Sequence, residues 1–279
     1  MNRIPLLLAP KAAPVRTPVV NGYTLWEGKS RGNGRPIAVV VTGVVNKSEN
    51  PKTGPMAQVW VIPTAELPAE AVKTGADEAV CNDCPFRAVV RKETGGTVAC
   101  YVRADAAVQQ VAKSYHAGRY PKLDRKAAAE LLAGLRVRGG AYGNLSNAPF
   151  WVSALWANNA QRHTQYDHNW RKADPRFALL AMASVGSPEE RDLARGLGWR
   201  TFRVKKPEAP VLPGERECPA QDKFRNAGRK HVTCHDCGAC HGTGGIPGKA
   251  DIVIDDHGPT SQGVQSKRWA TRMANAARR

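Results

Sequence analysis

Hydrophobic residues fall into short runs of strand length, separated by polar segments. Residues 35–43 and 57–62 are two such runs, both rich in β-branched side chains, and the segment 46–55 between them contains turn-forming residues throughout. β-Branched runs bounded by turn formers are typical of strands. We therefore expect a strand pair with an exposed connection. Residues 1–34, rich in proline, glycine and basic side chains, indicate an irregular lead-in.

Two helical patterns follow residue 104, and strand and helix patterns alternate from residue 136 onward. Asp124 is a candidate N-cap for a helix over 124–135. The sequence Ser187-Pro188-Glu189-Glu190 indicates a further helix start, with serine at the N-cap, proline in the first turn and glutamate at the third position. Other helices are expected at 104–116 and 149–161, and other strands at 136–142, 177–185, 199–204 and 251–254.

Strands that alternate with helices are usually parallel, with the helices packed outside them. The six expected strands favour an α/β fold, namely a TIM-barrel-like (βα) barrel that is irregular or incomplete. Residues 35–260 are expected to form it as a single domain, which includes two cysteine-rich segments, 81–100 and 218–240. A basic tail, 261–279, follows.

Four polar residues are candidates for chemistry because barrels carry their functional side chains in the loops after the strands. His163, Tyr166 and His168 lie in one expected loop, and Asn144 follows the expected strand 136–142. Imidazole titrates near neutral pH and is suited to proton transfer or to orienting a substrate. The alternative is that these side chains only satisfy backbone groups or fill the core.

The seven cysteines form two groups. The C-terminal cysteine group is Cys234, Cys237 and Cys240, together with the distant Cys218 and its following proline. A C-x2-C-x2-C run with a distant Cys-Pro is the ligand pattern of ferredoxin-type 4Fe–4S clusters, whose iron binds soft thiolates strongly. Zinc is the alternative, although a four-thiolate zinc site normally has two paired hooks. We expect these four residues to hold a 4Fe–4S cluster.

The N-terminal cysteine group is Cys81, Cys84 and Cys100. Three thiolates suit a 3Fe–4S cluster, a 4Fe–4S cluster with one open iron, or a zinc ion completed by a histidine such as His116. Free cysteine is also common as a buried structural thiol. Both groups could also meet in space and share a metal.

The net charge is +17, from 41 Lys and Arg against 24 Asp and Glu. A basic surface favours nucleic acid or another polyanion as a partner, although the sequence contains no helix-turn-helix, RRM or C2H2 spacing. No apolar run approaches the roughly 18 residues of a membrane span, and the N-terminus lacks the pattern of a secretory signal. We therefore expect a cytoplasmic protein with no membrane partner, in which disulfides are rare.

Several segments resemble a family of bacteriophage-encoded, cysteine-rich proteins that look distantly related to radical-SAM barrels. The resembling segments are 48–60, 81–87, 99–102, 136–144, 163–170, 183–190, 198–204 and 233–242. The resemblance implies a barrel with an iron–sulfur cluster in a host bacterial cytosol. Members tend to carry Gly-Asp-Pro where this chain has Gly143-Asn144-Leu145, so no role that needs a carboxylate at position 144 is expected.

Three functional hypotheses follow. The first is an iron–sulfur protein whose cluster is structural, redox-active or a Lewis acid, associated with nucleic acid. The second is a radical-SAM-like or other cluster-dependent enzyme, although the usual C-x3-C-x2-C signature is absent and only the N-terminal cysteine group could leave an iron open to SAM. The third is a zinc-binding protein that binds nucleic acid.

Overall fold

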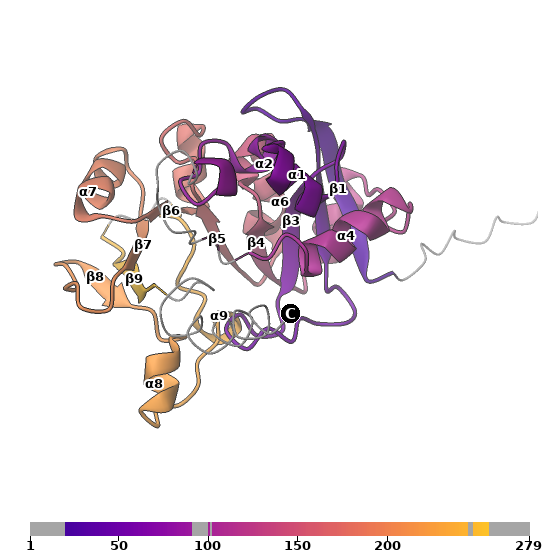
Figure 1. The fold of residues 1–279 in the computed structure, drawn as a ribbon. Helices are drawn as coiled ribbons and strands as arrows, with labels where there is room; N and C mark the ends of the chain where they lie inside the picture. The colour runs from indigo at the N-terminus through magenta and orange to yellow at the C-terminus, as the bar shows by residue number, and fades with distance from the viewer. Residues whose placement is uncertain (1–19, 91–99, 101, 245–247, 257–279) are drawn as a thin grey trace, which may run out of the picture.

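The computed structural model describes residues 20–90, 100, 102–244 and 248–256, which form a mixed α/β fold around one nine-stranded sheet (Figure 1). The strands are β1 (Gly22–Lys29), β2 (Pro36–Thr42), β3 (Ala57–Pro63), β4 (Arg136–Tyr142), β5 (Arg162–Asp167), β6 (Met182–Val185), β7 (Thr201–Lys205), β8 (Glu215–Glu217) and β9 (Asp251–Asp255). The helices are α1 (Pro68–Thr74), α2 (Glu78–Cys81), α4 (Ala107–His116), α5 (Arg125–Leu132), α6 (Phe150–Asn159), α7 (Pro188–Gly196), α8 (Asp222–Asn226) and α9 (Cys234–Cys237), with short 3-10 turns η1 (Leu145–Asn147) and η2 (Pro175–Leu179). The basic tail 261–279 and residues 1–19 of the lead-in lie outside the described residues.

One edge of the sheet is antiparallel. β2 pairs with β3 as expected, and β1, which lies within the expected irregular lead-in, pairs with β2. The expectation was wrong here because β1 is held by distant residues: the backbone of Thr24 bonds to Pro121 and Leu123. The connection between β2 and β3 is also less exposed than expected, since Thr53 and Gly54 are buried.

The rest of the sheet is parallel. β3 to β7 follow one another in chain order, and β9 lies between β7 and β8. The expected helix starts are confirmed: the side chain of Asp124 accepts the N–H of Ala127, and that of Ser187 accepts the N–H of Glu190. The expected strand 177–185 is shorter, because its first residues form η2 and only Met182–Val185 pair.

The mixture of helices and mostly parallel strands confirms the α/β class. The sheet is open, so the described residues do not form a closed barrel. The two edge strands, β1 and β8, pair only with β2 and β9 within the described chain. One edge is an antiparallel extension and the other is only three residues long, so neither offers a matching parallel edge for closure. The sheet also narrows at β5, which pairs with β6 through Tyr166 and Asp167 alone.

Two hydrophobic clusters of buried residues pack on the sheet. The larger cluster contains Trp156 of α6 and Ala194 of α7, packed on strand residues such as Ala183 and Val185. The smaller cluster lies on the other face of β6, β7 and β9, where Met182 and Ile252 pack with cysteine-bearing residues 218–240 instead of a helix layer. The sheet therefore presents one face to helices and part of the other to the C-terminal cysteine group.

Candidate metal centre

Residues 234–244, the cysteine loop, cross the amino ends of the parallel strands. The loop begins at α9, where Thr233 and Asp236 form a capping box, and the helix ends at Gly238, whose φ of 63° is in the left-handed region. Ahead of β3, the N–H of Cys234 donates to Lys52 O at 3.0 Å. Ahead of β6, the N–H of Thr243 donates to Ala178 O at 2.9 Å. The loop therefore ties together strands that are far apart in the sequence.

Three arginines at the starts of strands hold this loop. Arg136, the first residue of β4, donates to His235 O at 2.7 Å, and Arg162, the first residue of β5, donates to Asp236 O at 2.8 Å. Arg200, just before β7, donates to the carbonyls of Ala239 at 3.0 Å and His241 at 2.6 Å, and also to Ala250. These contacts satisfy loop carbonyls and place positive charge around the cysteines.

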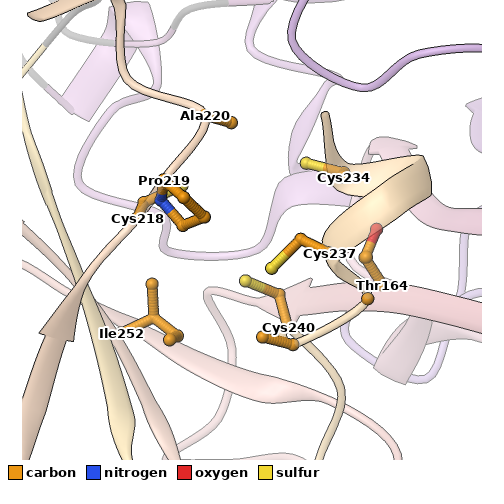
Figure 2. A pocket seen from close by; sticks show the side chains of 10 residues that line it. Thr164, Cys218, Pro219, Ala220, Cys234, Cys237, Cys240 and Ile252 are labelled. Atoms are coloured by element: carbon orange, nitrogen blue, oxygen red, sulfur yellow. The ribbon is translucent and has the colours of Figure 1, made fainter. Parts of the chain in front are cut away.

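All four thiols of the C-terminal cysteine group line one cavity, together with Thr164 of β5 and Ile252 of β9. Figure 2 shows the sulfurs of Cys234, Cys237 and Cys240 facing the segment of Cys218 and Ala220 across this cavity. Within the described residues, no three His, Cys, Asp or Glu side chains are grouped as they would be around a single ion. The four cysteines therefore share one cavity, although they come from two segments of the chain.

The environment of the thiols combines burial with positive charge. Burial raises the pKa of Cys218 to about 11 and also raises the pKa values of Cys234 and Cys240. The nearby Arg138 and Lys52 act in the opposite direction on Cys234, and the hydroxyl of Tyr166 donates a hydrogen bond to the sulfur of Cys240, which favours the thiolate. Burial costs a neutral thiol little free energy. A thiolate here would be stabilised by the positive charges of Arg138 and Lys52 and by the hydroxyl of Tyr166.

These residues fit a thiolate-bound metal group. The four cysteines are free thiols, and soft anionic sulfur is the donor that iron–sulfur clusters and zinc require. The hydroxyl of Thr164 is buried at the cavity and has no hydrogen-bond partner among the described residues. A buried hydroxyl without a partner is costly, and an anionic sulfur in the cavity would give it an acceptor.

The structure places the residues expected to carry proton chemistry in β5 and just after it. Tyr166 lies in the strand β5, not in a loop, and contacts the C-terminal cysteine group. His163 is also in β5, and its Nε2–H donates to Leu180 O at 2.9 Å. Burial lowers the pKa of His163 and lowers that of His168 to about 4. Burial therefore favours the neutral form of both imidazoles.

Asn144 lies beyond the carboxyl ends of the parallel strands, just after β4. Its side chain donates to Cys81 O and to Asn82 Oδ1, both at 3.2 Å, and accepts the backbone N–H of His168 at 3.0 Å. Asn147 adds further bonds to Asn82. Asn144 thus links the end of α2 to the end of β5, which is a structural role.

The N-terminal cysteine group lies at these same carboxyl ends of the strands. Cys81 ends α2, and the N–H of Cys84 donates to Cys81 O at 3.1 Å. Burial raises the pKa of all three thiols, to about 12 for Cys84. His116 is exposed at the end of α4, where its ring packs against Tyr115 with centroids 5.4 Å apart.

The two cysteine groups do not share a site. The cysteine loop contacts Arg136 at the start of β4, whereas Cys81 is bonded to Asn144 just beyond the end of β4. A strand of seven residues spans about 20 Å. The C-terminal cysteine group therefore lies near the amino ends of the strands, and the N-terminal group lies near their carboxyl ends.

The three arginines were missed by sequence reasoning, although a signal was present. An arginine stands at the start of β4, at the start of β5 and directly before β7. The net positive charge predicts a basic surface, but the side chain of Arg200 is buried and only 7% exposed.

Comparisons with protein-family models, with curated proteins and with solved structures find no match to this chain. Among the described residues, no helix has the length and apolar character needed to cross a membrane.

Proposed function

We propose that this is an iron–sulfur protein in which Cys218, Cys234, Cys237 and Cys240 hold a 4Fe–4S cluster. The observation that carries the proposal is that four free thiols from two distant segments line one cavity. Their spacing, C-x2-C-x2-C with a remote Cys-Pro, is that of ferredoxin-type ligands. Three bunched cysteines and one remote cysteine favour a cluster over zinc, because a four-thiolate zinc site normally has two paired hooks.

The first role we propose for the cluster is a clamp. Cys218 follows β8, and the other three ligands belong to the loop that crosses the amino ends of the strands. A group bound by both segments would join the last strands of the sheet to its middle. Arg162 and Arg200 would support it by holding the loop carbonyls and by offsetting the negative charge of the thiolates.

A second property of such a cluster is one-electron chemistry. This chain's own residues would tune it: Tyr166 donates to the sulfur of Cys240, and Ile252 and Ala220 contribute apolar walls that limit water. Hydrogen bonds to sulfur and exposure to solvent both set the potential of a cluster.

The strand order is compatible with an incomplete (βα) barrel. β3 to β7 are parallel and adjacent in chain order, as in barrels, whereas doubly wound sheets reverse their order at a switch point. The cysteine-bearing residues 218–240 then cover the face that would be the interior of a closed barrel.

The test is iron and sulfide analysis, with EPR spectroscopy, of the full chain purified anaerobically. We expect iron and sulfide in the ratio of a cluster, and Cys240→Ser should remove the visible absorption of the C-terminal centre. Cys84→Ser is the matched control, since it changes a buried thiol near the carboxyl ends of the strands. It should leave that absorption in place. A colourless chain that contains zinc and no iron would contradict the proposal.

A further inference from the structure

We propose that a cavity at the amino ends of β7, β8 and β9 binds an organic ligand that carries a diphosphate group. The cavity has a volume of about 480 Å³, which is within the usual range of sites for small molecules. Its lining comes from the turn between α7 and β7, the start of β8 and the segment that leads into β9. Because β7 and β8 both pair in parallel with β9, these segments meet at one end of the sheet (Figure 1). No cysteine is among its described lining residues, so the inference does not rest on the proposed cluster.

Four cationic residues line this diphosphate cavity. They are Arg195 at the end of α7, Arg200 before β7, Arg216 in β8 and Lys249 before β9. Arg216 is exposed and Lys249 is half-buried, and neither forms an ion pair within the described part of the chain. Their charges are therefore available to a ligand.

Arg200 is a buried cation whose donors bind only neutral groups. Its guanidinium donates to the carbonyl oxygens of Ala239, His241 and Ala250, and it forms no ion pair with the described carboxylates. Burial lowers the pKa of Arg200, because the buried cation loses hydration. Carbonyls satisfy its N–H groups without neutralising its charge, so an anion in the cavity would stabilise it.

Two carboxylates also line the cavity, but both already have cationic partners. The side chain of Glu215 is buried, and its two oxygens accept bonds from Arg203 at 2.6 and 2.7 Å. One carboxylate oxygen of Asp251 lies 3.7 Å from the Nε atoms of both Arg191 and Arg195. The cavity therefore keeps an excess of positive charge.

This charge and this volume together favour a diphosphate ester. Guanidinium groups bind phosphate oxygens in pairs, and lysine adds a compact positive charge. A single phosphate monoester carries a charge of about −2 near pH 7, so a diphosphate matches the three cations that lack an acidic partner more closely. The remaining volume accommodates the organic part of the ligand. Nucleic acid fits less well, because its backbone is bound by extended grooves rather than by a single cavity.

The test is isothermal titration calorimetry on the full chain. The probes are inorganic pyrophosphate and ADP, with AMP and adenosine for comparison. We expect pyrophosphate and ADP to bind, AMP to bind about tenfold more weakly than ADP, and adenosine not to bind. If neither pyrophosphate nor ADP binds at millimolar concentration, the site does not exist. Equal affinities for ADP and AMP would overturn the choice of a diphosphate.

The double variant Arg216→Gln/Lys249→Gln assigns the binding to this cavity. Neither side chain has an ion pair to lose in the described residues, so the variant should fold, as urea unfolding will verify. We expect its affinity for ADP to fall about a hundredfold, roughly tenfold for each lost charge-assisted hydrogen bond.

The control is Arg119→Gln/Lys126→Gln, which removes the same charge from exposed positions in and before α5. Its affinity for ADP should equal that of the wild type. If both double variants lose affinity equally, net charge accounts for the binding and the proposal fails. It also fails if the chain binds a single-stranded oligonucleotide but not ADP or pyrophosphate, because the cations would then serve a nucleic-acid surface.

Discussion

A hydrogen bond from the hydroxyl of Tyr166 lowers the pKa of the Cys240 thiol, against the larger effect of burial, so this side chain of β5 lies beside a proposed cluster ligand. The ring of Tyr166 packs against Phe202 of β7 with centroids 4.4 Å apart, which holds the hydroxyl in position. The N–H of the neighbouring Gln165 donates to Cys240 O at 2.8 Å. Cys240 is therefore attached to β5 through both its backbone and its sulfur.

Tyr166→Phe should lower the reduction potential of the cluster without removing it. A donor to sulfur stabilises the more negative, reduced state, so its loss favours the oxidised state. If the bond is worth about 1 kcal/mol more in the reduced state, the potential falls by roughly 40 mV. Redox titration followed by EPR measures this shift. Tyr120→Phe, beside β1, is the control and should leave the potential unchanged; equal potentials in both variants would refute the assignment.

Arg200→Ala should loosen the cysteine loop. Arg200 donates to the carbonyls of Ala239, His241 and Ala250, and no other described donor is recorded for these three oxygens. Hydrogen bonds from a charged group are worth about 1.5–3 kcal/mol, and we expect a loss of about 3 kcal/mol in unfolding free energy. Urea unfolding measures it. Arg200→Lys keeps the charge but loses the planar fork, and should fall between wild type and Arg200→Ala.

The control for Arg200 is Arg119→Ala, which removes the same charge from an exposed position. Its unfolding curve should stay close to that of the wild type. If both alanine variants unfold alike, net charge and not the loop contacts accounts for the effect.

Much of the fold could be predicted because its elements carry local signals. The caps at Asp124 and Ser187 and the apolar runs of β2 and β3 need only neighbouring residues to be recognised. β5 could not be predicted, because its residues are polar on both faces. Gln165 accepts a bond from Trp156, Asp167 accepts bonds from Ser146, and the other face meets the cysteine group. No hydrophobic alternation remains to mark it as a strand.

The grouping of the four cysteines could be predicted from the sequence, and their surroundings could not. Cysteine spacing was enough to group Cys218 with the distant C-x2-C-x2-C run, and the structure places all four at one cavity. Its location at the amino ends of the strands depends on long-range contacts such as Arg136 to His235. The charge of the chain was harder to interpret, because arginines such as Arg203 are buried in internal ion pairs. Association with nucleic acid therefore stays a prediction.

Asn144→Asp should destabilise the protein. The side-chain amide of Asn144 donates to Cys81 O and Asn82 Oδ1, and a carboxylate cannot donate to either. Two acceptors would then face a buried charge, which should cost about 3 kcal/mol. Urea unfolding of the metal-free chain measures the cost. Asn33→Asp, an exposed control whose Oδ1 only accepts, should have little effect; a stable Asn144→Asp would refute the structural role.

Asp167 makes stability depend on pH. Its carboxyl group is fully buried at the end of β5, where it accepts bonds from Ser146 Oγ at 3.0 Å, from Ser146 N at 3.1 Å and from Asn169 N at 2.8 Å. Burial outweighs these bonds and raises the pKa of Asp167 to about 6, from an ordinary value of 3.8. The folded protein therefore holds this proton more tightly than the unfolded chain does.

The sign of the effect follows from that difference. The contribution of Asp167 to stability is fully present below about pH 4 and is lost as pH rises through about 6, because the unfolded carboxyl group ionises first. A difference of about two pKa units corresponds to roughly 3 kcal/mol. Relative to wild type, Asp167→Asn should gain that amount in urea unfolding between pH 4 and pH 7, and no more above pH 7. Asp174→Asn is the control, since Arg176 lowers the pKa of Asp174 and it titrates below this range. Parallel curves for wild type and Asp167→Asn would show that folding does not raise the pKa of Asp167, so that its three hydrogen bonds offset the cost of its burial.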